Sequence, residues 1–364
     1  MLIRARLALS ALVPLLCGGG AAAQQDSATT PAEGEKITLD VVVTSKSGPP
    51  VTGLQQQDFT LLDNKVARPI TSFQALGRSR APVEVIVVVD AVNTGIEQVS
   101  YEREEIEKFL RTDGGHLAYP TTIAVFTDNG IQKLGDLTDD GNALSALLDH
   151  SNTSLRYIGR SAGFYGATDR FYLSLKALNE LTASAASLPG RKVILWVSPG
   201  WPLLSGPNVE LDYKQEQGLF ENIVAMSTQL RKTRTTLYSV DPLGSADFGG
   251  RTFYYQEFLK GISKPSQVNA GDLALQVLAV QSGGLALTAS NDIALLLQKC
   301  MADTDVYYEM TFDSPASGDK DEYHHLEIEV DKAGLTARTR QGYYVPSGEK
   351  KMKEVPILEN PVKH

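Results

Sequence analysis

Residues 83 to 94 read V-E-V-I-V-V-V-D-A-V-N-T, and this stretch decides the fold class. Residues 85 to 89 are apolar at every position, a pattern typical of a strand that is buried on both faces of a parallel sheet. The run ends at Asp90, and a short polar segment leads into a helical pattern. Open α/β sheets bind ligands just beyond the carboxyl ends of their strands, so Asp90 is the first candidate for a functional residue. The alternative is an Asp that only caps the following helix.

The middle of the chain alternates between strand patterns and helical patterns. Strands are expected at residues 85–90, 121–127, 192–197, 235–240 and 285–288, with a short edge segment near 131–134. Helices are expected at residues 98–111, 141–150, 168–187, 215–232, 272–281 and 292–302. Such alternation predicts a doubly wound, mostly parallel α/β sheet with right-handed crossovers.

Both ends of the chain carry β patterns instead. Residues 36–80 contain three short strand patterns separated by turn residues, and residues 303–347 contain strand patterns at 306–312, 323–330 and 335–344. Three short strands are too few for a stable closed sandwich. We therefore expect the two segments to pair in one β-sandwich, with residues 81–302 inserted as the α/β domain. Two separate small β units are the alternative.

The first residues have the features of an export signal. Arg4 and Arg6 provide a charged start, residues 7–17 are mostly apolar, and Ala21-Ala22-Ala23 fits a cleavage site. Residues 1–23 are therefore expected to be a signal peptide, residues 24–35 a disordered tether and residues 348–364 a tail. The protein is expected to be periplasmic or secreted. Cleavage would leave Cys300 as the one cysteine, in a pattern typical of a buried helix face.

Charge and composition narrow the classes of partner. The 364 residues carry a formal net charge of −9, and 42% of them are hydrophobic. An acidic chain is a poor match for nucleic acid or an anionic membrane. We expect no nucleic-acid partner and no membrane insertion after signal cleavage, which leaves a protein partner that the sequence does not identify.

Four stretches, taken in order, resemble the von Willebrand factor type A (vWA) domain, and most closely the exported acidobacterial "VWFA-related" family. They are V-V-V-T-S-K-S-G-P-P-V-T-G-L at 41–54 with Q-D-F-T-L-L-D-N at 57–64, V-I-V-V-V-D-A-V-N-T at 85–94, R-K-V-I-L-W-V-S-P-G at 191–200, and Y-Y-E-M-T-F at 307–312 followed by R-Q-G-Y-Y at 340–344. Together these stretches span nearly the whole mature chain. The resemblance implies a vWA-like α/β domain at residues 81–302.

The resemblance also implies a metal-ion-dependent adhesion site, in which oxygen ligands hold Mg²⁺ and a partner's carboxylate completes the coordination shell. Asp90 matches the first Asp of that motif, Thr94 its second hydroxyl and Thr168 its loop Thr. Val92 and Pro199 stand where a hydroxyl and a carboxylate are expected. We therefore expect a degenerate site, with no cofactor or a weakly bound Mg²⁺.

The loops after the strands contain aromatic residues, and aromatic side chains are favoured as anchors at interfaces. Tyr165, Trp201 and Tyr254 are the candidates for partner binding. The alternative is that these rings pack down and cover the edge of the sheet.

The expected function is that of an exported, non-enzymatic, adhesion- or scaffold-type protein. The alternative is a hydrolase that uses carboxylates at the strand ends, and it would need a second acid near Asp90, with Asp241 as the candidate. Ser198 also follows a strand, but its turn lacks the first glycine of the hydrolase Gly-x-Ser-x-Gly elbow. The five histidines show no zinc-like spacing.

Overall fold

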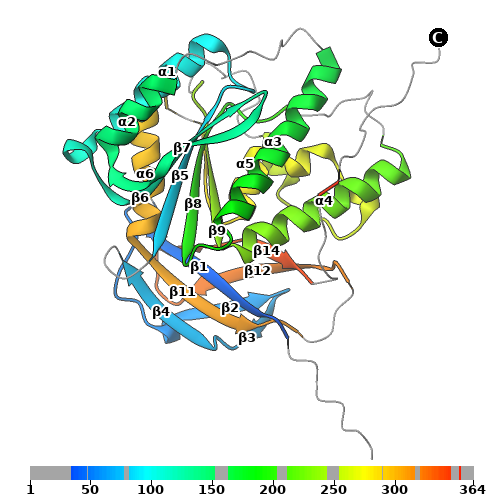
Figure 1. Cartoon of the computed structure of the whole chain (residues 1–364). Coiled ribbons are helices and arrows are strands. Elements are labelled where there is room, and N and C mark those ends of the chain that lie inside the picture. The colour runs from blue at the N-terminus through cyan, green and yellow to red at the C-terminus, as the bar shows by residue number, and fades with distance from the viewer. Residues whose placement is uncertain are drawn as a thin grey trace, which may run out of the picture.

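The structure is a computed structural model that describes residues 34–46, 48–77, 82–151, 163–202, 211–243, 254–288, 290–315, 320–345 and 352–353. An α/β lobe lies above a smaller β-sandwich in Figure 1. The expected signal peptide lies outside the described residues, as do most of the expected tether and tail. Within the described part, no helix is long and apolar enough to cross a membrane.

A six-stranded sheet forms the centre of the α/β lobe, in the order β10-β9-β8-β5-β6-β7. Neighbouring strands are parallel except for β6 and β7, which are antiparallel. Counted from β5, this is the 3-2-1-4-5-6 order of doubly wound folds. The strands are β5 (Val83–Asp90), β6 (His116–Thr127), β7 (Gly130–Asp140), β8 (Arg191–Val197), β9 (Thr235–Val240) and β10 (Ala286–Leu287).

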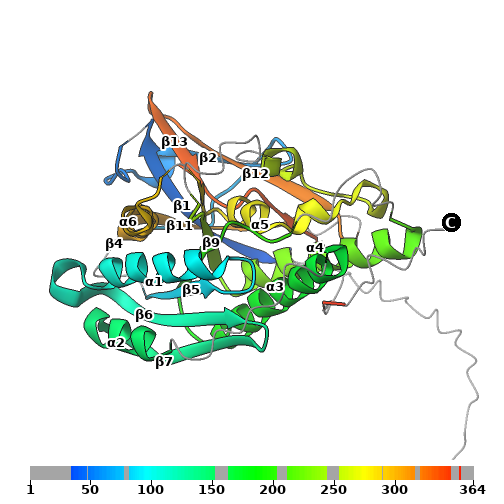
Figure 2. The same cartoon turned by 90° about the horizontal axis from the view of Figure 1, so that it is seen from above.

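Helices cover both faces of this sheet (Figures 1 and 2). Alternate residues of β5 enter different cores: Val85, Val87 and Val89 pack on one side, and Ile86 and Val88 on the other. The first side is covered by α1 (Ile96–Leu110), α2 (Gly141–His150) and α6 (Ile293–Asp305), where Cys300 is buried as expected. The second side is covered by α3 (Gly163–Ala185), α4 (Tyr213–Lys232) and α5 (Leu275–Gln281).

The sandwich is built from both ends of the chain. One sheet has the order β13-β1-β11-β4 and the other the order β14-β12-β2-β3. Its strands are β1 (Lys36–Ser45), β2 (Phe59–Asp63), β3 (Val66–Arg68), β4 (Ser72–Gly77), β11 (Val306–Asp313), β12 (Tyr323–Val330), β13 (Leu335–Arg338) and β14 (Gly342–Tyr344). Because β1 pairs with β11 and β2 with β12, the predicted fold class, an α/β sheet inserted in one β-sandwich, is confirmed.

Three local expectations were wrong. The expected strand at 335–344 is two strands, β13 and β14, which belong to different sheets. Between them the chain leaves the sandwich, since Gln341 N–H donates to Gln281 O and buried Arg340 donates to Leu230 O. The expected helix at 272–281 is divided, because Ala274 is extended between the 3₁₀ turn η8 (Ala270–Leu273) and α5. The edge segment near 131–134 is part of the much longer β7.

Shorter 3₁₀ turns occupy several of the connections. They are η1 (Gln56–Asp58), η2 (Thr112–Gly115), η6 (Tyr254–Phe258) and η7 (Pro265–Gln267). Of these, η6 follows β9 in the chain and contributes Tyr255 to a small core with Ala274 and Val277.

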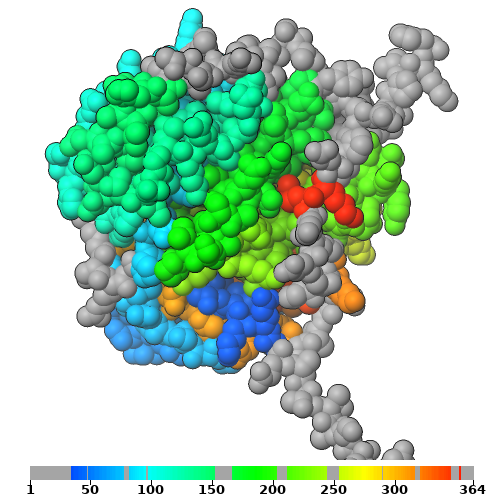
Figure 3. Space-filling view, in the orientation of Figure 1, coloured from blue at the N-terminus to red at the C-terminus, as the bar shows by residue number. Residues whose placement is uncertain are grey.

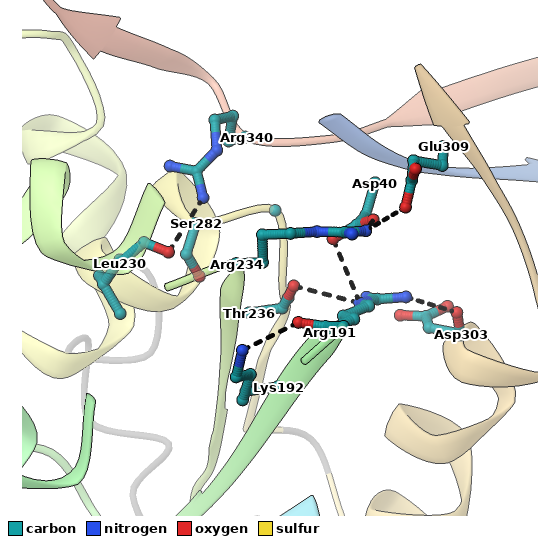
Figure 4. A network of polar contacts seen from close by, with 12 residues as sticks. Asp40, Arg191, Lys192, Leu230, Arg234, Thr236, Ser282, Asp303, Glu309 and Arg340 are labelled. Atoms are coloured by element: carbon teal, nitrogen blue, oxygen red, sulfur yellow. Dashed lines mark hydrogen bonds and ion pairs between the residues drawn. The ribbon is translucent and has the colours of Figure 1, made fainter. Parts of the chain in front are cut away.

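Arginines at the amino ends of β8 and β9 join the two lobes (Figure 4). Arg234 Nη2 donates to Asp40 Oδ1 of β1 at 2.6 Å and to Glu309 Oε2 of β11 at 2.5 Å. Arg191, which is almost fully buried, donates to the carbonyl oxygen of Asp303 and lies over the Tyr307 ring. Burial works against both charges, but the neighbouring acidic and phenolic groups outweigh it and raise both arginine pKa values.

Candidate functional site

Asp90 is the last residue of β5 and is fully buried. It lies where the strand order runs in opposite directions, towards β6 on one side and β8 on the other. This switch point is the position at which doubly wound sheets bind ligands. The structure therefore places the first sequence candidate at the expected end of the central strand.

Four protein donors surround the Asp90 carboxyl. Oδ1 accepts hydrogen bonds from the backbone N–H groups of Val92 (3.0 Å) and Asn93 (2.9 Å). Oδ2 accepts from Asn93 Nδ2 (2.9 Å) and Trp196 Nε1 (3.0 Å). A carboxylate has about four lone-pair sites, so these bonds account for all of them. Asp90 thus caps the turn that follows β5, while the N-cap of α1 is Gly95.

The indole of Trp196 is held in place by strand register and aromatic contacts. Trp196 pairs with Val88 across β5 and β8, so its side chain and that of Asp90 are on the same face of the sheet. The ring packs edge-on against Phe126 and Trp201, with ring centroids 5.8 Å and 5.4 Å apart, respectively. These contacts point the indole N–H at the carboxyl group.

Asn93 extends this network to α3. Its Nδ2 also donates to Ser174 Oγ at 2.9 Å, and Ser174 Oγ donates to the carbonyl oxygen of Arg170 at 2.7 Å. The network therefore ties β5, β8 and α3 together without a charged donor among these bonds. Burial raises the pKa of Asp90, and the hydrogen bonds from Asn93, Trp196 and Ser198 oppose that rise only in part.

A second buried carboxyl, Glu102 of α1, was missed by the sequence analysis. It is fully buried, and neither of its oxygens has a well-formed hydrogen bond to another described residue. Burial is the main cause that raises the pKa of Glu102 well above its ordinary value, and the charge of Asp90 adds to it, while the neighbouring Thr94 hydroxyl opposes it. The spacing Val99, Glu102, Ile106 places Glu102 in the apolar stripe of α1, and that signal was present in the sequence.

The predicted metal ligands do not form a metal site in the described part of the chain. Asp90 has its oxygens occupied, Thr94 is buried beside Glu102, and Thr168 is half-buried in α3. Val92 belongs to the apolar core. Among the residues that the structure describes, no three His, Cys, Asp or Glu side chains are placed to share a metal ion. These residues do not fit the octahedral oxygen shell that Mg²⁺ requires.

The three aromatic candidates differ in their surroundings. Trp201 is only 3% exposed and packs on Trp196, so the expectation that it anchors a partner at the surface is wrong. Its ring does what the alternative predicted, because it extends the core over the end of the sheet. The Tyr165 side chain lies outside the described residues. Tyr254 is half-buried, and its hydroxyl donates to Gln276 Oε1 at 3.0 Å.

Gln276 connects Tyr254 to the turn after β8. Its Nε2 donates to the carbonyl oxygen of Pro199 at 3.4 Å. Gly200 has a φ of +105°, and a Cβ atom there would meet Gln276 Nε2 at 2.5 Å. The positive φ favours glycine at this position, and a larger residue would also displace the Gln276 amide.

The hydrolase candidates are also buried. Ser198 Oγ accepts a hydrogen bond from Gly200 N–H at 3.1 Å, and Ser198 is fully buried. Asp241 Oδ1 accepts from Leu243 N–H at 2.8 Å. Ser198 therefore bonds within its own turn and to the Asp90 carboxyl rather than facing a substrate.

No protein-family model and no curated protein matches the chain. Among solved structures, the chain is similar to the manganese-loaded TRAP protein of Plasmodium vivax, with 11% identity, 76% of this chain and 98% of that chain covered, and a TM-score of 0.36. It is also similar to the SpRpn10 VWA domain, with 14% identity, coverage of 61% and 96%, and a TM-score of 0.30.

A third similar structure is proximal thread matrix protein 1 from the mussel byssus, with 11% identity, 61% of this chain covered and a TM-score of 0.33. The chain spans about half the length of that structure, with 47% covered. At such scores these likenesses carry no argument about function. The fold class rests on the strand order and register given above.

Proposed function

We propose that this chain is an exported, non-enzymatic protein of the vWA type that binds a protein partner without needing a metal ion at Asp90. The partner would contact the end of the α/β lobe at which β5, β8 and β9 terminate. The sandwich would then serve as a stalk or a second contact surface. The signal-like first residues support export, and the acidic composition supports a protein partner over nucleic acid.

The saturated carboxyl of Asp90 is the observation that carries this proposal. A Mg²⁺ ion could bind Asp90 only if it displaced donors such as Trp196 Nε1, which is held by the surrounding rings. A general base must reach a substrate proton, and Asp90 is fully buried. Neither metal-dependent adhesion nor catalysis by this carboxyl suits that arrangement.

The contact surface would include Tyr254, which is half-buried near the carboxyl ends of the strands. Buried Gln276 bonds to the Tyr254 hydroxyl and to the carbonyl oxygen of Pro199, so a partner would meet a tyrosine that is already held in place. The hydrolase alternative finds no comparable support, because Ser198 and Asp90 are both buried.

The test is thermal unfolding of the mature chain in EDTA and then in millimolar Mg²⁺, Mn²⁺ or Ca²⁺, alongside Asp90→Ala. A ligand that binds only the folded state raises the melting temperature by mass action. We expect no metal-dependent rise in the native chain. Asp90→Ala should lower the free energy of unfolding by about 2–4 kcal/mol in every buffer, because Trp196 and Asn93 lose their acceptor.

Asp169→Ala is the matched control, since Asp169 is an exposed carboxylate next to Thr168. It should leave both stability and metal response unchanged. A metal-dependent rise in the native chain that disappears in Asp90→Ala would contradict the proposal. Partner capture from an envelope extract in EDTA, compared between the native chain and Tyr254→Ala, then tests the contact surface itself.

A further inference from the structure

Helix α4 contains a fully buried asparagine that binds a peptide backbone rather than another side chain. Asn222 Oδ1 accepts from the backbone N–H of Lys353 at 2.8 Å, and its Nδ2 donates to the carbonyl oxygen of the same residue at 2.9 Å. A neighbouring β-strand residue makes the same pair of bonds. Asn222 therefore binds the backbone of Lys353 with the pair of bonds that an extended strand would make.

Asn222 lies among apolar residues of α4, where its amide group needs hydrogen-bond partners. Its neighbours along α4, including Leu219, Ile223 and Met226, belong to the apolar core. A buried amide in such a place is costly unless it is hydrogen-bonded. Gly218 and Ala225 lie one turn before and one turn after Asn222, so the residues that flank it on this face of the helix are small.

In the two described residues of the bound segment, 352 and 353, both side chains add contacts to the backbone pair. Met352 packs against the core that α4 shares with α3 and α5. Lys353 Nζ forms an ion pair with Glu221 at 2.5 Å, but the lysine side chain is 63% exposed, so this pair adds little affinity. In Figure 3 the segment appears in red at the surface beside α4. Of the two residues of this segment that the structure describes, one is mostly exposed, so the pair can be exchanged for a similar one.

We propose that the α4 surface around Asn222 is a peptide-binding site for an extended protein segment in which an apolar residue is followed by a lysine. The chain's own Met352 and Lys353 occupy it in cis, and a partner's segment of the same pattern binds by displacing them. This site is on a different surface from the loops of the proposed function and does not depend on them. The backbone pair and the packing of the first residue against the apolar core supply most of the binding, and Glu221 adds a small preference for lysine at the second.

The test uses full-length protein and a labelled synthetic peptide, K-K-M-K-E-V-P, which copies residues 350–356. In the native chain the cis segment competes with the peptide. Met352→Asp removes the apolar anchor of the cis segment and should strengthen peptide binding by about tenfold or more, which corresponds to about 1.4 kcal/mol. Lys353→Ala is the control, because it leaves the backbone pair and the apolar anchor in place, and it should change peptide binding by less than about threefold.

A peptide that is methylated on the backbone nitrogen of its third lysine, which follows the methionine and corresponds to Lys353, cannot donate to Asn222 Oδ1. It should bind Met352→Asp at least about tenfold more weakly than the unmodified peptide, since a buried acceptor loses its donor. This comparison leaves the protein unchanged, so it holds even where Asn222→Leu fails to fold. Equal binding of both peptides, or no binding to Met352→Asp, would overturn the proposal and leave residues 352 and 353 as a fixed part of the fold.

Discussion

The two ends of the central sheet bury their charged groups in opposite ways. At the carboxyl ends of the strands, Asp90 is surrounded by neutral donors and Glu102 has no well-formed partner among the described residues. At the amino ends, Arg234 bonds directly to Asp40 and Glu309. At the carboxyl ends, burial raises the pKa values of Asp90 and Glu102. At the amino ends, Asp40 and Glu309 raise the pKa of Arg234.

This difference separates a structural junction from a candidate site. Buried charges that are paired and hydrogen-bonded can join two lobes, although their net contribution to the free energy of folding is modest. Removing one partner is strongly destabilising, because it leaves the other charge buried and uncompensated. Buried carboxyls without a neighbouring cation have raised pKa values, and such perturbed groups gather at functional positions. Substitutions at the two ends should therefore have effects of different size and sign.

The largest effect is expected at the junction. Arg191→Met should lower the free energy of unfolding by about 3–5 kcal/mol, because the Asp303 carbonyl oxygen loses a buried donor, Asp40 loses an ion-pair partner and the Tyr307 contact disappears. Urea denaturation measures the change. Lys36→Met is the control, since the Lys36–Asp313 pair is exposed and should contribute less than about 1 kcal/mol. Equal losses in both variants would mean that the junction is no more than a surface pair.

A smaller loss is expected at the carboxyl end. Trp196→Phe keeps a ring between Phe126 and Trp201 but removes one donor to Asp90, and it should cost about 1–3 kcal/mol. It should also raise the Asp90 pKa further, because that hydrogen bond favours the ionised form. The melting temperature measured without Mg²⁺ checks the loss of stability, and its change on adding Mg²⁺ checks whether the ion binds at Asp90. A strong metal response in this variant would show that the indole alone keeps a cation away.

The smallest change, and one of opposite sign, is expected for Glu102→Gln. The pKa of Glu102 is raised in the folded state, so its ionisation opposes folding, and the stability of the native chain should fall as pH rises from 4.5 towards the raised value. The amide does not ionise, so the free energy of unfolding of the variant should equal or exceed that of the native chain above neutral pH.

Unfolding in urea at several pH values between 4 and 9 compares the two chains. The same chemical change at the junction, Asp40→Asn, should instead be destabilising at neutral pH, because Arg234 and Arg191 lose a carboxylate. If Glu102→Gln lost stability across the whole pH range, Glu102 would have to be a paired, ionised group, and the contrast between the two ends would fail.

Much of the fold could be predicted from local pattern. The apolar run before Asp90 specified a strand buried on both faces, and its register with β6 and β8 agrees with that. The alternation of His324, Leu326 and Ile328 specified a half-buried strand, and all three are buried. These features depend on the period of side chains along a strand, which is written directly in the sequence.

The surroundings of the candidate site were harder to predict from the sequence. Sequence position identified Asp90 as the residue at the end of the central strand, but the match to a metal motif did not reveal that Trp196, more than a hundred residues later, supplies a hydrogen bond. Trp201 was expected at the surface because it lies in a loop, and it is buried because Trp196 offers it a packing partner. To predict that Glu102 is buried, one would have to recognise that it lies in the apolar stripe of α1 and to know which part of the sheet that stripe packs against.

The sequence by itself determined the order of the elements, the insertion of an α/β lobe between two β segments and the place of Asp90 in that order. These follow from side-chain periodicity and turn chemistry, which act over a few residues. Only the tertiary structure decided what surrounds each buried charge: neutral donors at Asp90, arginines at Asp40 and the backbone of Lys353 at Asn222. The energy of a buried polar group depends on partners brought close by folding, and distance along the chain does not record them.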